Sequence, residues 1–284
     1  MSVRATYLRQ YNKRIDTSQL EKPDLEGVRG AILLPKNTSP GPDGIPFAAW
    51  RATVDLAAPI LHAVMNSLCS GQPPPAGFNH ALLFLLPKKK TDLVFDTRPL
   101  SVTNTDNRIL AALMAKVIMP SVLELIDLAQ KGLGNGRSGA DHTVDINEFF
   151  YEGVEEKIDR YLFLLDTAKA FDSIDHKWIT LMLAKTKFPQ WFQSFVKAAL
   201  SEVRVAPFFG KSVTEWIPIE RGVKQGCPLS PLLFIIAYDP LLHRLRSLTN
   251  ISSYAFADDL AITSDNFDSV TPALRALNDL KSPG

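Results

Sequence analysis

The stretch AFADDLAI, residues 255–262, places two adjacent aspartates between two short apolar segments. Neighbouring side chains of a strand point to opposite faces, so a strand through both aspartates would bury one of them without a partner. We therefore predict a hairpin with strands at 252–257 and 260–263 and with Asp258 and Asp259 in its turn. Taken alone, the pair favours an ordinary turn, because aspartate tolerates turn geometry well.

A second segment, FLLDTAKAFDSIDH at 163–176, also carries a carboxylate at the end of an apolar run. The run 161–165 predicts a buried strand that ends at Asp166. A helix is predicted to follow over 172–185, since aspartate and serine are common at helix starts. Taken alone, this pattern is again typical of a strand end followed by a helix cap.

Together the two segments indicate a site for divalent cations. If the strand before Asp166 and the hairpin are neighbours in one sheet, then Asp166, Asp258 and Asp259 converge. Clustered carboxylates repel one another, and a cation with oxygen ligands relieves that repulsion. Two magnesium ions about 3.5–4 Å apart can activate an attacking hydroxyl and stabilise a leaving pyrophosphate.

The remaining segments predict an alternation of helices and strands. Two extended pieces, 81–86 and 98–103, form a basic hairpin around three consecutive lysines. The element order predicts an α+β fold in which helices pack on a mostly antiparallel sheet. Further helices are expected at 47–69, 104–128, 143–156 and 230–245 and near the end of the chain from about 269, and further strands at 203–209 and 213–219.

Composition narrows the class of protein. The chain has 284 residues, of which 46% are hydrophobic and 21% charged, so a folded protein is expected rather than a disordered one. Two cysteines exclude a disulfide-stapled scaffold and a four-cysteine zinc site. The half up to His142 is net basic and the remainder net acidic, as a protein that binds a polyanion and metal ions would need. With neither a signal peptide nor a membrane span expected, we predict an intracellular protein without a membrane partner, in the nucleus or the cytoplasm.

Seven pieces of the chain occur in the order in which one family of polymerases carries its motifs. They are SPGPDGIP (39–46), LLPKKK (85–90), TRPLSV (97–102), QKGLGNGRSGADH (130–142), FLLDTAKAFDSIDH (163–176), GVKQGCPLSPLLF (222–234) and AFADDLAI (255–262). With these motifs the chain resembles the reverse transcriptase domain of non-LTR (LINE-type) retrotransposons, with group II intron enzymes as relatives. The resemblance covers the chain from about Pro35 to its end.

The resemblance implies the fingers and palm of a right-hand polymerase. Residues 1–34 would be an N-terminal lead-in, and 35–160 the fingers, with part of the palm helices at about 104–128. Residues 161–284 would be the palm, with its antiparallel sheet and the catalytic aspartates. The family continues with a helical thumb, and we expect that thumb to be absent here.

The resemblance also assigns roles to the acidic residues and to one aromatic residue. Asp166, Asp258 and Asp259 match the catalytic aspartates. The metal ligands would be the carboxylates of Asp166 and Asp258 and the main-chain carbonyl of Thr167, and the ions two Mg²⁺, with Mn²⁺ as an alternative. Phe171 matches the bulky side chain that excludes a ribose 2′-hydroxyl and so favours deoxynucleotides; its alternative role is a core anchor for its helix.

Basic and loop residues complete the expected site. Lys88 and Arg98 match the residues that hold the nucleoside triphosphate, which suits a mobile lysine charge and a planar arginine fork. Gln225 and Gly226 match the loop against the nascent base pair, where glycine lets the backbone approach closely. Two further residues are assigned to nucleic-acid contacts, Gly222 in the same loop and Arg137 at the template backbone.

The implied function is an RNA-directed DNA polymerase, which joins a dNTP to a primer 3′-hydroxyl on an RNA template. Its partners would be the RNA template, a DNA primer and dNTPs, with thumb or endonuclease portions of a longer protein missing. Without a thumb we expect the chain alone to be weakly active or inactive. Two alternatives stay open: a non-catalytic truncated remnant that folds or binds RNA, and another palm-type polymerase.

Overall fold

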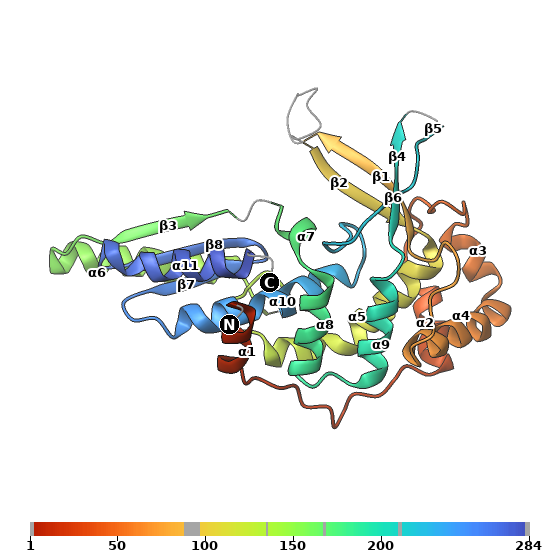
Figure 1. Ribbon diagram of the computed structural model, residues 1–284, viewed down its shortest axis with the longest axis horizontal. Helices are drawn as coiled ribbons and strands as arrows, with labels where there is room; N and C mark the ends of the chain where they lie inside the picture. The colour runs from red at the N-terminus through yellow and green to blue at the C-terminus, as the bar shows by residue number, and fades with distance from the viewer. Residues whose placement is uncertain (1–2, 88–96, 135, 167–168, 210–211, 282–284) are drawn as a thin grey trace.

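The described strands form two separate sheets, one projecting at the top of the helical body and one lying at its left in Figure 1. The computed structural model describes residues 3–87, 97–134, 136–166, 169–209 and 212–281. One sheet has the order β2-β1-β4-β5, with β6 also paired to β4, and the other has the order β3-β8-β7. The strands are β1 (His80–Pro87), β2 (Thr97–Thr103), β3 (Tyr161–Leu165), β4 (Arg204–Phe209), β5 (Ser212–Val213), β6 (Ile217–Pro218), β7 (Ser252–Phe256) and β8 (Asp259–Ser264).

Helices fill the space between and below the sheets, so the predicted α+β class is confirmed. They are α1 (Val3–Gln10), α2 (Leu25–Leu33), α3 (Phe47–Ala52), α4 (Val54–Cys69), α5 (Thr105–Leu125), α6 (Gly139–Glu156), α7 (Ala170–Ser173), α8 (His176–Lys185), α9 (Gln190–Ala199), α10 (Ser230–Arg246) and α11 (Val270–Lys281), with a short 3₁₀ turn, η2 (Phe267–Ser269), before the last. In the described ranges no helix combines the length and the apolar composition needed to cross a membrane.

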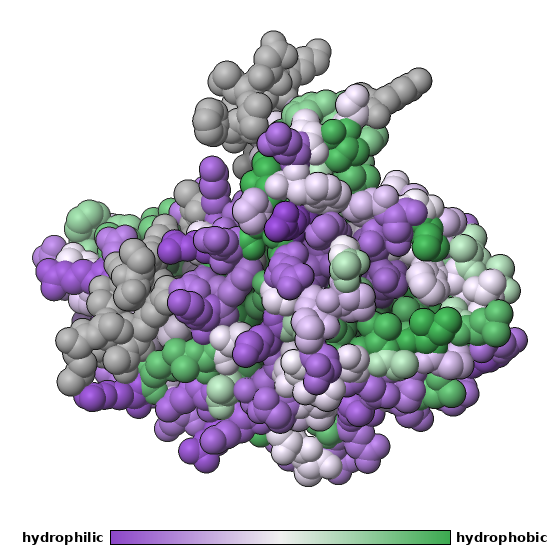
Figure 2. Space-filling view, turned by 45° about the vertical axis from the view of Figure 1, so that its right-hand side comes forward, coloured by the Kyte–Doolittle hydropathy of each residue, from purple (hydrophilic) through white to green (hydrophobic). Residues whose placement is uncertain are grey.

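Two helices, α5 and α10, carry the centre of the hydrophobic core. α10 is buried on nearly every side, and α5 on all sides except a stripe through Lys116, Pro120 and Glu124, so both sequences are apolar around most of the helix. The predicted start of α10 is confirmed, with Pro231 in its first turn, where a missing N–H costs nothing. On the face drawn in Figure 2 the surface is mostly hydrophilic, and hydrophobic residues gather over one part of the helical body.

One buried charge ties the N-terminal segment to this core. Asp239 lies in the middle of α10 with a fully buried side chain, where an unpaired carboxylate would be costly. Its Oδ2 accepts hydrogen bonds from the Tyr11 hydroxyl at 2.6 Å and from Lys13 Nζ at 2.9 Å. Burial, and then the charge of Asp239, raise the pKa of Tyr11 far above its usual range. The lead-in is therefore an integral part of the fold.

The first sheet departs from the predicted antiparallel pattern. The β1–β2 hairpin is antiparallel as expected, with Leu86 opposite Arg98. However, β1 also pairs with β4, and that pairing is parallel, with Ala81 opposite Val205. Parallel neighbours need a long crossover, and several helices lie between these two strands in the chain.

Several local predictions in the second half are wrong. Asp259 begins β8, so the hairpin turn consists of Ala257 and Asp258, and the strand expected over 213–219 is the two short strands β5 and β6. The strand β3 is not buried on both faces, since Leu164 is 77% exposed. The single helix expected over 172–185 is two helices, because Asp175 acts as the N-cap of α8 and accepts a hydrogen bond from the main-chain N–H of Lys177 at 2.8 Å.

Asp106 in the first turn of α5 generates a pH-dependent prediction. Burial, with a smaller contribution from Asp43, raises the pKa of this carboxyl to about 6. The folded state therefore disfavours the ionised form, and the cost develops as pH rises from its ordinary pKa of 3.8 to about 6. We expect Asp106→Asn to raise the free energy of unfolding at pH 7 by about 1–3 kcal/mol, measured by urea denaturation.

The gain should disappear below pH 3.8, where the wild-type carboxyl is protonated in both states. The matched control is Asp55→Asn, which changes the exposed first-turn aspartate of α4. A gain that is the same at pH 3 and pH 7, or one of equal size in the Asp55 variant, would contradict the prediction.

Candidate active site

The register of the second sheet brings the three predicted aspartates together. Leu165 at the end of β3 lies opposite Leu260 in β8, so Asp166 follows at the edge where β8 begins with Asp259. Asp258 occupies the tight turn between β7 and β8. All three aspartates line one cleft.

The electrostatics of this cluster suit a cation. Burial raises the pKa of the Asp258 carboxyl, and the charges of Asp259 and Asp166 raise it further, while Arg98 acts in the opposite direction. The carboxylates therefore repel one another, and in the described part of the chain no salt bridge compensates any of them. Oxygen donors of this kind fit Mg²⁺ or Mn²⁺.

The cation would need ligands beyond side chains. Among the described residues, no three acidic, histidine or cysteine side chains stand close enough to enclose a metal ion. Magnesium is commonly bound by only one or two carboxylates together with substrate phosphates, so a pair of aspartates on an open cleft is sufficient on the protein side. Two predicted site residues, Thr167 with its carbonyl ligand and the triphosphate lysine Lys88, lie outside the residues that the structure describes.

The cleft has a volume of about 860 Å³ and gathers residues from four parts of the fold. Besides the aspartates, Arg98 contributes from β2, Phe171 from α7, and Gln225 and Gly226 from the loop before α10. These are the residues that the motifs predicted. Sequence reasoning missed Lys169, Asp172 and Lys224, which also line the cleft. Lys169 was detectable as the basic residue between Asp166 and Phe171.

Phe171 packs in the core and also lines the cleft. Its ring stacks on Phe234 of α10 with centroids 4.2 Å apart and planes 17° apart. The same residue lines the cleft beside the aspartates. It is therefore anchored in the core and also borders the space above the acidic cluster.

The loop 222–226 is held between β2 and α7 by main-chain hydrogen bonds. Ser101 in β2 donates its N–H to the carbonyl of Gln225 at 2.7 Å, and Val223 donates to the carbonyl of Phe171 at 2.8 Å. The Gln225 amide donates to Asp172 Oδ1 at 3.3 Å. The loop thus fixes the Phe171 segment relative to the strand that carries Arg98.

Gly222 packs against the protein's own main chain, and its predicted contact with nucleic acid stays a prediction. It is buried, has φ +82°, and lies against Asp172, whose carbonyl oxygen would be 2.6 Å from an added Cβ. The close approach that glycine permits is therefore to the protein's own backbone. Gly226, with φ +110°, is exposed on the cleft, and an added Cβ there would lie 2.8 Å from the carbonyl oxygen of Ser101.

Arg137 is also engaged inside the protein. Its guanidinium donates to the carbonyls of Leu123 at 2.7 Å, Gln130 at 2.8 Å and Asp127 at 2.9 Å. These bonds satisfy carbonyls at and beyond the C-terminal end of α5, which have no helical partner. The structure gives Arg137 a structural role, and its contacts lend no support to the predicted template contact.

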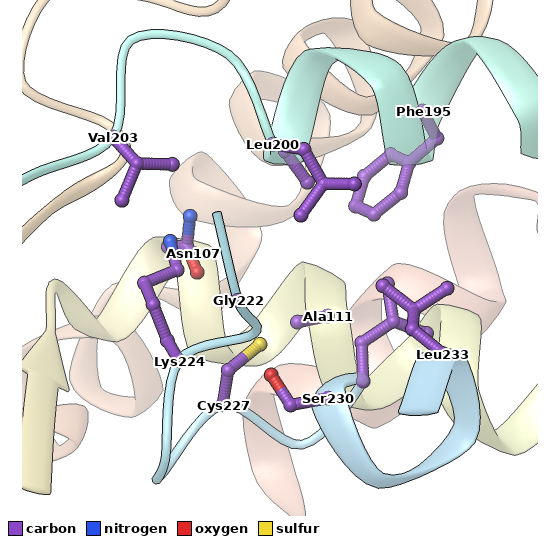
Figure 3. Close-up of a pocket in the computed structure, with 12 residues that line it drawn as sticks. Asn107, Ala111, Phe195, Leu200, Val203, Gly222, Lys224, Cys227, Ser230 and Leu233 are labelled. Carbon is purple, nitrogen blue, oxygen red and sulfur yellow. The ribbon is translucent and has the colours of Figure 1, made fainter. Parts of the chain in front are cut away.

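Beneath the loop lies a small cavity of about 20 Å³, shown in Figure 3. Lys224 lines both this cavity and the cleft, and its Nζ is buried and has no hydrogen-bond partner among the described residues. Burial lowers the pKa of Lys224, and the nearby Cys227 acts in the opposite direction. Lys224, Cys227 and Asn107 of α5 all line this cavity (Figure 3). The signal for Lys224 in the sequence was a lysine inside an otherwise uncharged motif.

Comparison with known proteins identifies the class. Residues 86–282 match the family described as reverse transcriptase (RNA-dependent DNA polymerase). Because this match spans well over half of the chain, the protein belongs to the reverse transcriptase family.

Relatives narrow the placement within that family. The chain is 29% identical over 261 residues to the transposon TX1 uncharacterized 149 kDa protein of Xenopus laevis, with 87% of this chain and 20% of that protein covered. It is 30% identical over 259 residues to the retrovirus-related Pol polyprotein from the type-2 retrotransposable element R2DM of Drosophila melanogaster, with 87% and 23% covered. It is 26% identical over 249 residues to the RNA-directed DNA polymerase from mobile element jockey of the same fly, with 84% and 27% covered.

These relatives confirm the predicted resemblance to reverse transcriptase domains of non-LTR (LINE-type) retrotransposons. The chain spans between 20% and 27% of the length of these three curated relatives. The activities of the longer proteins therefore bear on this chain only as proposals.

The position of Gly222 generates a prediction about the cleft. We expect Gly222→Ala to lower the free energy of unfolding by about 1–3 kcal/mol more than Gly44→Ala does, measured by urea denaturation. Both glycines have positive φ, +82° and +71°, so an alanine at either position is strained to a similar degree by its backbone conformation. Only at Gly222 does the new methyl group meet a neighbouring main chain, whereas nothing lies within 4 Å of the Cβ position at Gly44. Equal losses in the two variants would show that the loop is not tightly packed against Asp172.

Proposed function

We propose that the chain is the fingers-and-palm core of an RNA-directed DNA polymerase and that the cleft is its active site. The observation that carries this proposal is the convergence of Asp166, Asp258 and Asp259 on one cleft with Arg98. In this proposal residues 1–34 are the lead-in, 35–160 the fingers and 161–284 the palm. The burial of α5 in the core beside α10 supports counting 104–128 with the palm helices.

The acidic side of the cleft would hold two divalent cations. Asp166 and Asp258 would be their side-chain ligands, together with the carbonyl of Thr167, and Asp259 would complete the catalytic set. When bound, the ions supply charge neutralisation for the attacking primer hydroxyl and for the leaving pyrophosphate. The mutual repulsion that raises the pKa of Asp258 is the feature of this chain that such ions would relieve.

The other side of the cleft would bind the nucleotide. Arg98, an exposed arginine on β2, offers two parallel donors to phosphate oxygens, and Lys169 adds a second positive charge near the aspartates. Lys88 would contribute a third, as the motif predicts. Together these groups would orient the triphosphate so that its α-phosphate faces the primer 3′-hydroxyl.

The floor of the cleft would set the choice of sugar and the seat of the base pair. Phe171 would exclude a ribose 2′-hydroxyl, because its ring is held from behind by Phe234 and has little room to retreat. Gly226 exposes backbone, and the Gln225 amide is oriented by Asp172, so this loop would lie against the nascent pair. The RNA template and DNA primer would be gripped through their backbone and shape.

The central prediction concerns Asp258. Asp258→Asn should lower Mg²⁺-dependent addition of one dNTP to a primer on RNA by at least about a hundredfold, since a cation ligand contributes several kcal/mol. The rate is measured with the chain in excess over primer and template, so that slow addition remains detectable. The matched control is Asp265→Asn, an exposed aspartate just past the opposite end of β8.

Equal rates in the wild type and the Asp258 variant would contradict an active site in this cleft. Retained RNA binding with no metal-dependent addition by the wild type would instead favour the non-catalytic alternative.

A second prediction concerns the sugar. Phe171→Val should reduce the preference for dNTP over rNTP by about tenfold to a hundredfold, because the smaller side chain leaves room for the 2′-hydroxyl. The ratio of the two addition rates is measured in the same preparation, so a lower folded fraction cancels. An unchanged ratio would leave Phe171 with its core role alone.

A further inference from the structure

The turn that carries Asp258 has a backbone conformation that its own sequence does not favour. Ala257 stands at the start of this turn with φ +53°, in the left-handed region that costs a residue with a Cβ about 1 kcal/mol or more. The turn therefore needs support from elsewhere to hold that shape.

One side chain from a distant segment supplies that support. Gln130 is completely buried, and its amide pairs with both main-chain polar groups of Ala257. Its Oε1 accepts the N–H of Ala257 at 2.8 Å, and its Nε2 donates to the carbonyl of Ala257 at 3.1 Å. The same Oε1 also accepts the N–H of Gly132 at 2.9 Å.

The segment around Gln130 is itself anchored beside β7. Ala255 donates its N–H to the carbonyl of Ala129 and accepts from the N–H of Lys131, both at 2.8 Å, so this segment extends the second sheet as a parallel bridge. Gly132 passes so close to the turn that an added Cβ would lie 2.1 Å from the nitrogen of Ala257. The segment that carries Gln130 is therefore itself held in place beside the turn.

We infer that Gln130 is a positioning residue for the active site, which holds the Ala257–Asp258 turn in the shape that presents the Asp258 carboxylate to a divalent cation. Gln130 touches neither the cleft nor the reacting atoms and acts through the main chain of Ala257. A side chain that orients a metal ligand in this way typically changes metal affinity or activity by ten- to a hundredfold when removed. The expected effect on cation binding rests on the proposed function. The hold of Gln130 on the turn rests only on its hydrogen bonds to Ala257.

The first experiment needs no metal. Gln130→Met keeps the length of the side chain but makes none of these hydrogen bonds, so the Ala257 amide should exchange with solvent at least about tenfold faster, read by NMR in metal-free protein. Gln130→Glu keeps an acceptor for this N–H but loses the donor to the carbonyl of Ala257, so it should restore slow exchange only in part. The matched control is Gln193→Met on α9, which removes another amide that donates to a main-chain carbonyl, that of Phe188, at 2.7 Å.

The second experiment measures Mn²⁺ affinity from the electron paramagnetic resonance signal of the free ion. Gln130→Met should raise about tenfold the Mn²⁺ concentration at which half of the folded molecules bind the ion. Gln193→Met should leave this concentration unchanged. A role in stability alone would change the folded fraction but not this concentration. If Gln130→Met does not fold, Gln130→Asn replaces it, since that amide is one methylene too short to reach both groups of Ala257.

The outcomes separate the inference from the proposed function. Unchanged exchange of the Ala257 amide, or unchanged Mn²⁺ affinity, in a folded Gln130 variant overturns the inference. If Asp258→Asn also leaves Mn²⁺ binding unchanged, the proposed cation site itself fails, because the wild-type ion then binds elsewhere.

Discussion

The antiparallel pairing of β3 with β8 is the constraint on which the cleft depends. Because Leu165 lies opposite Leu260, the chain leaves β3 at the point where it enters β8, and Asp166 meets Asp259 there. A slip of one residue would turn every side chain of the strand to the other face. The burial of Ile262 on the covered face, opposite Phe163, opposes such a slip. The hydrophobic effect on one face of the sheet thus sets the geometry of the charges at its edge.

The two halves of the cleft come from different sheets, and the loop 222–226 links them. The strand carrying Arg98 is bonded to this loop through Ser101, and the segment carrying Phe171 is bonded to it through Val223. The separation between the basic and acidic sides therefore depends on main-chain hydrogen bonds, whose lengths vary little. Glycine is required where the backbones come closest, because any side chain would push the two halves apart.

Local features of the fold could be predicted, whereas most long-range ones could not; the meeting of Asp166 with the Asp258 hairpin was expected with the help of the family resemblance. The hairpin around Asp258 and the start of α10 follow from turn and cap chemistry within a few residues. The parallel pairing of β1 with β4 and the docking of Tyr11 on Asp239 join segments far apart in the chain, and no local preference encodes them. For the same reason the sequence showed the candidate carboxylates by residue type, but it did not show that Gly222 packs against Asp172 or that Arg137 binds main-chain carbonyls.

The chemistry of the acidic turn explains why a neutral amide, that of Gln130, holds it in place. A group that holds the Ala257 turn beside three carboxylates must offer both a donor and an acceptor. A glutamate there would add a fourth negative charge, and a lysine or arginine would only donate and would compete with a cation for the aspartates. A neutral amide meets both needs, and its burial keeps water from competing for the same bonds. Gln130 therefore carries no charge or nucleophile that would mark it as functional, although the position of the acidic turn depends on it.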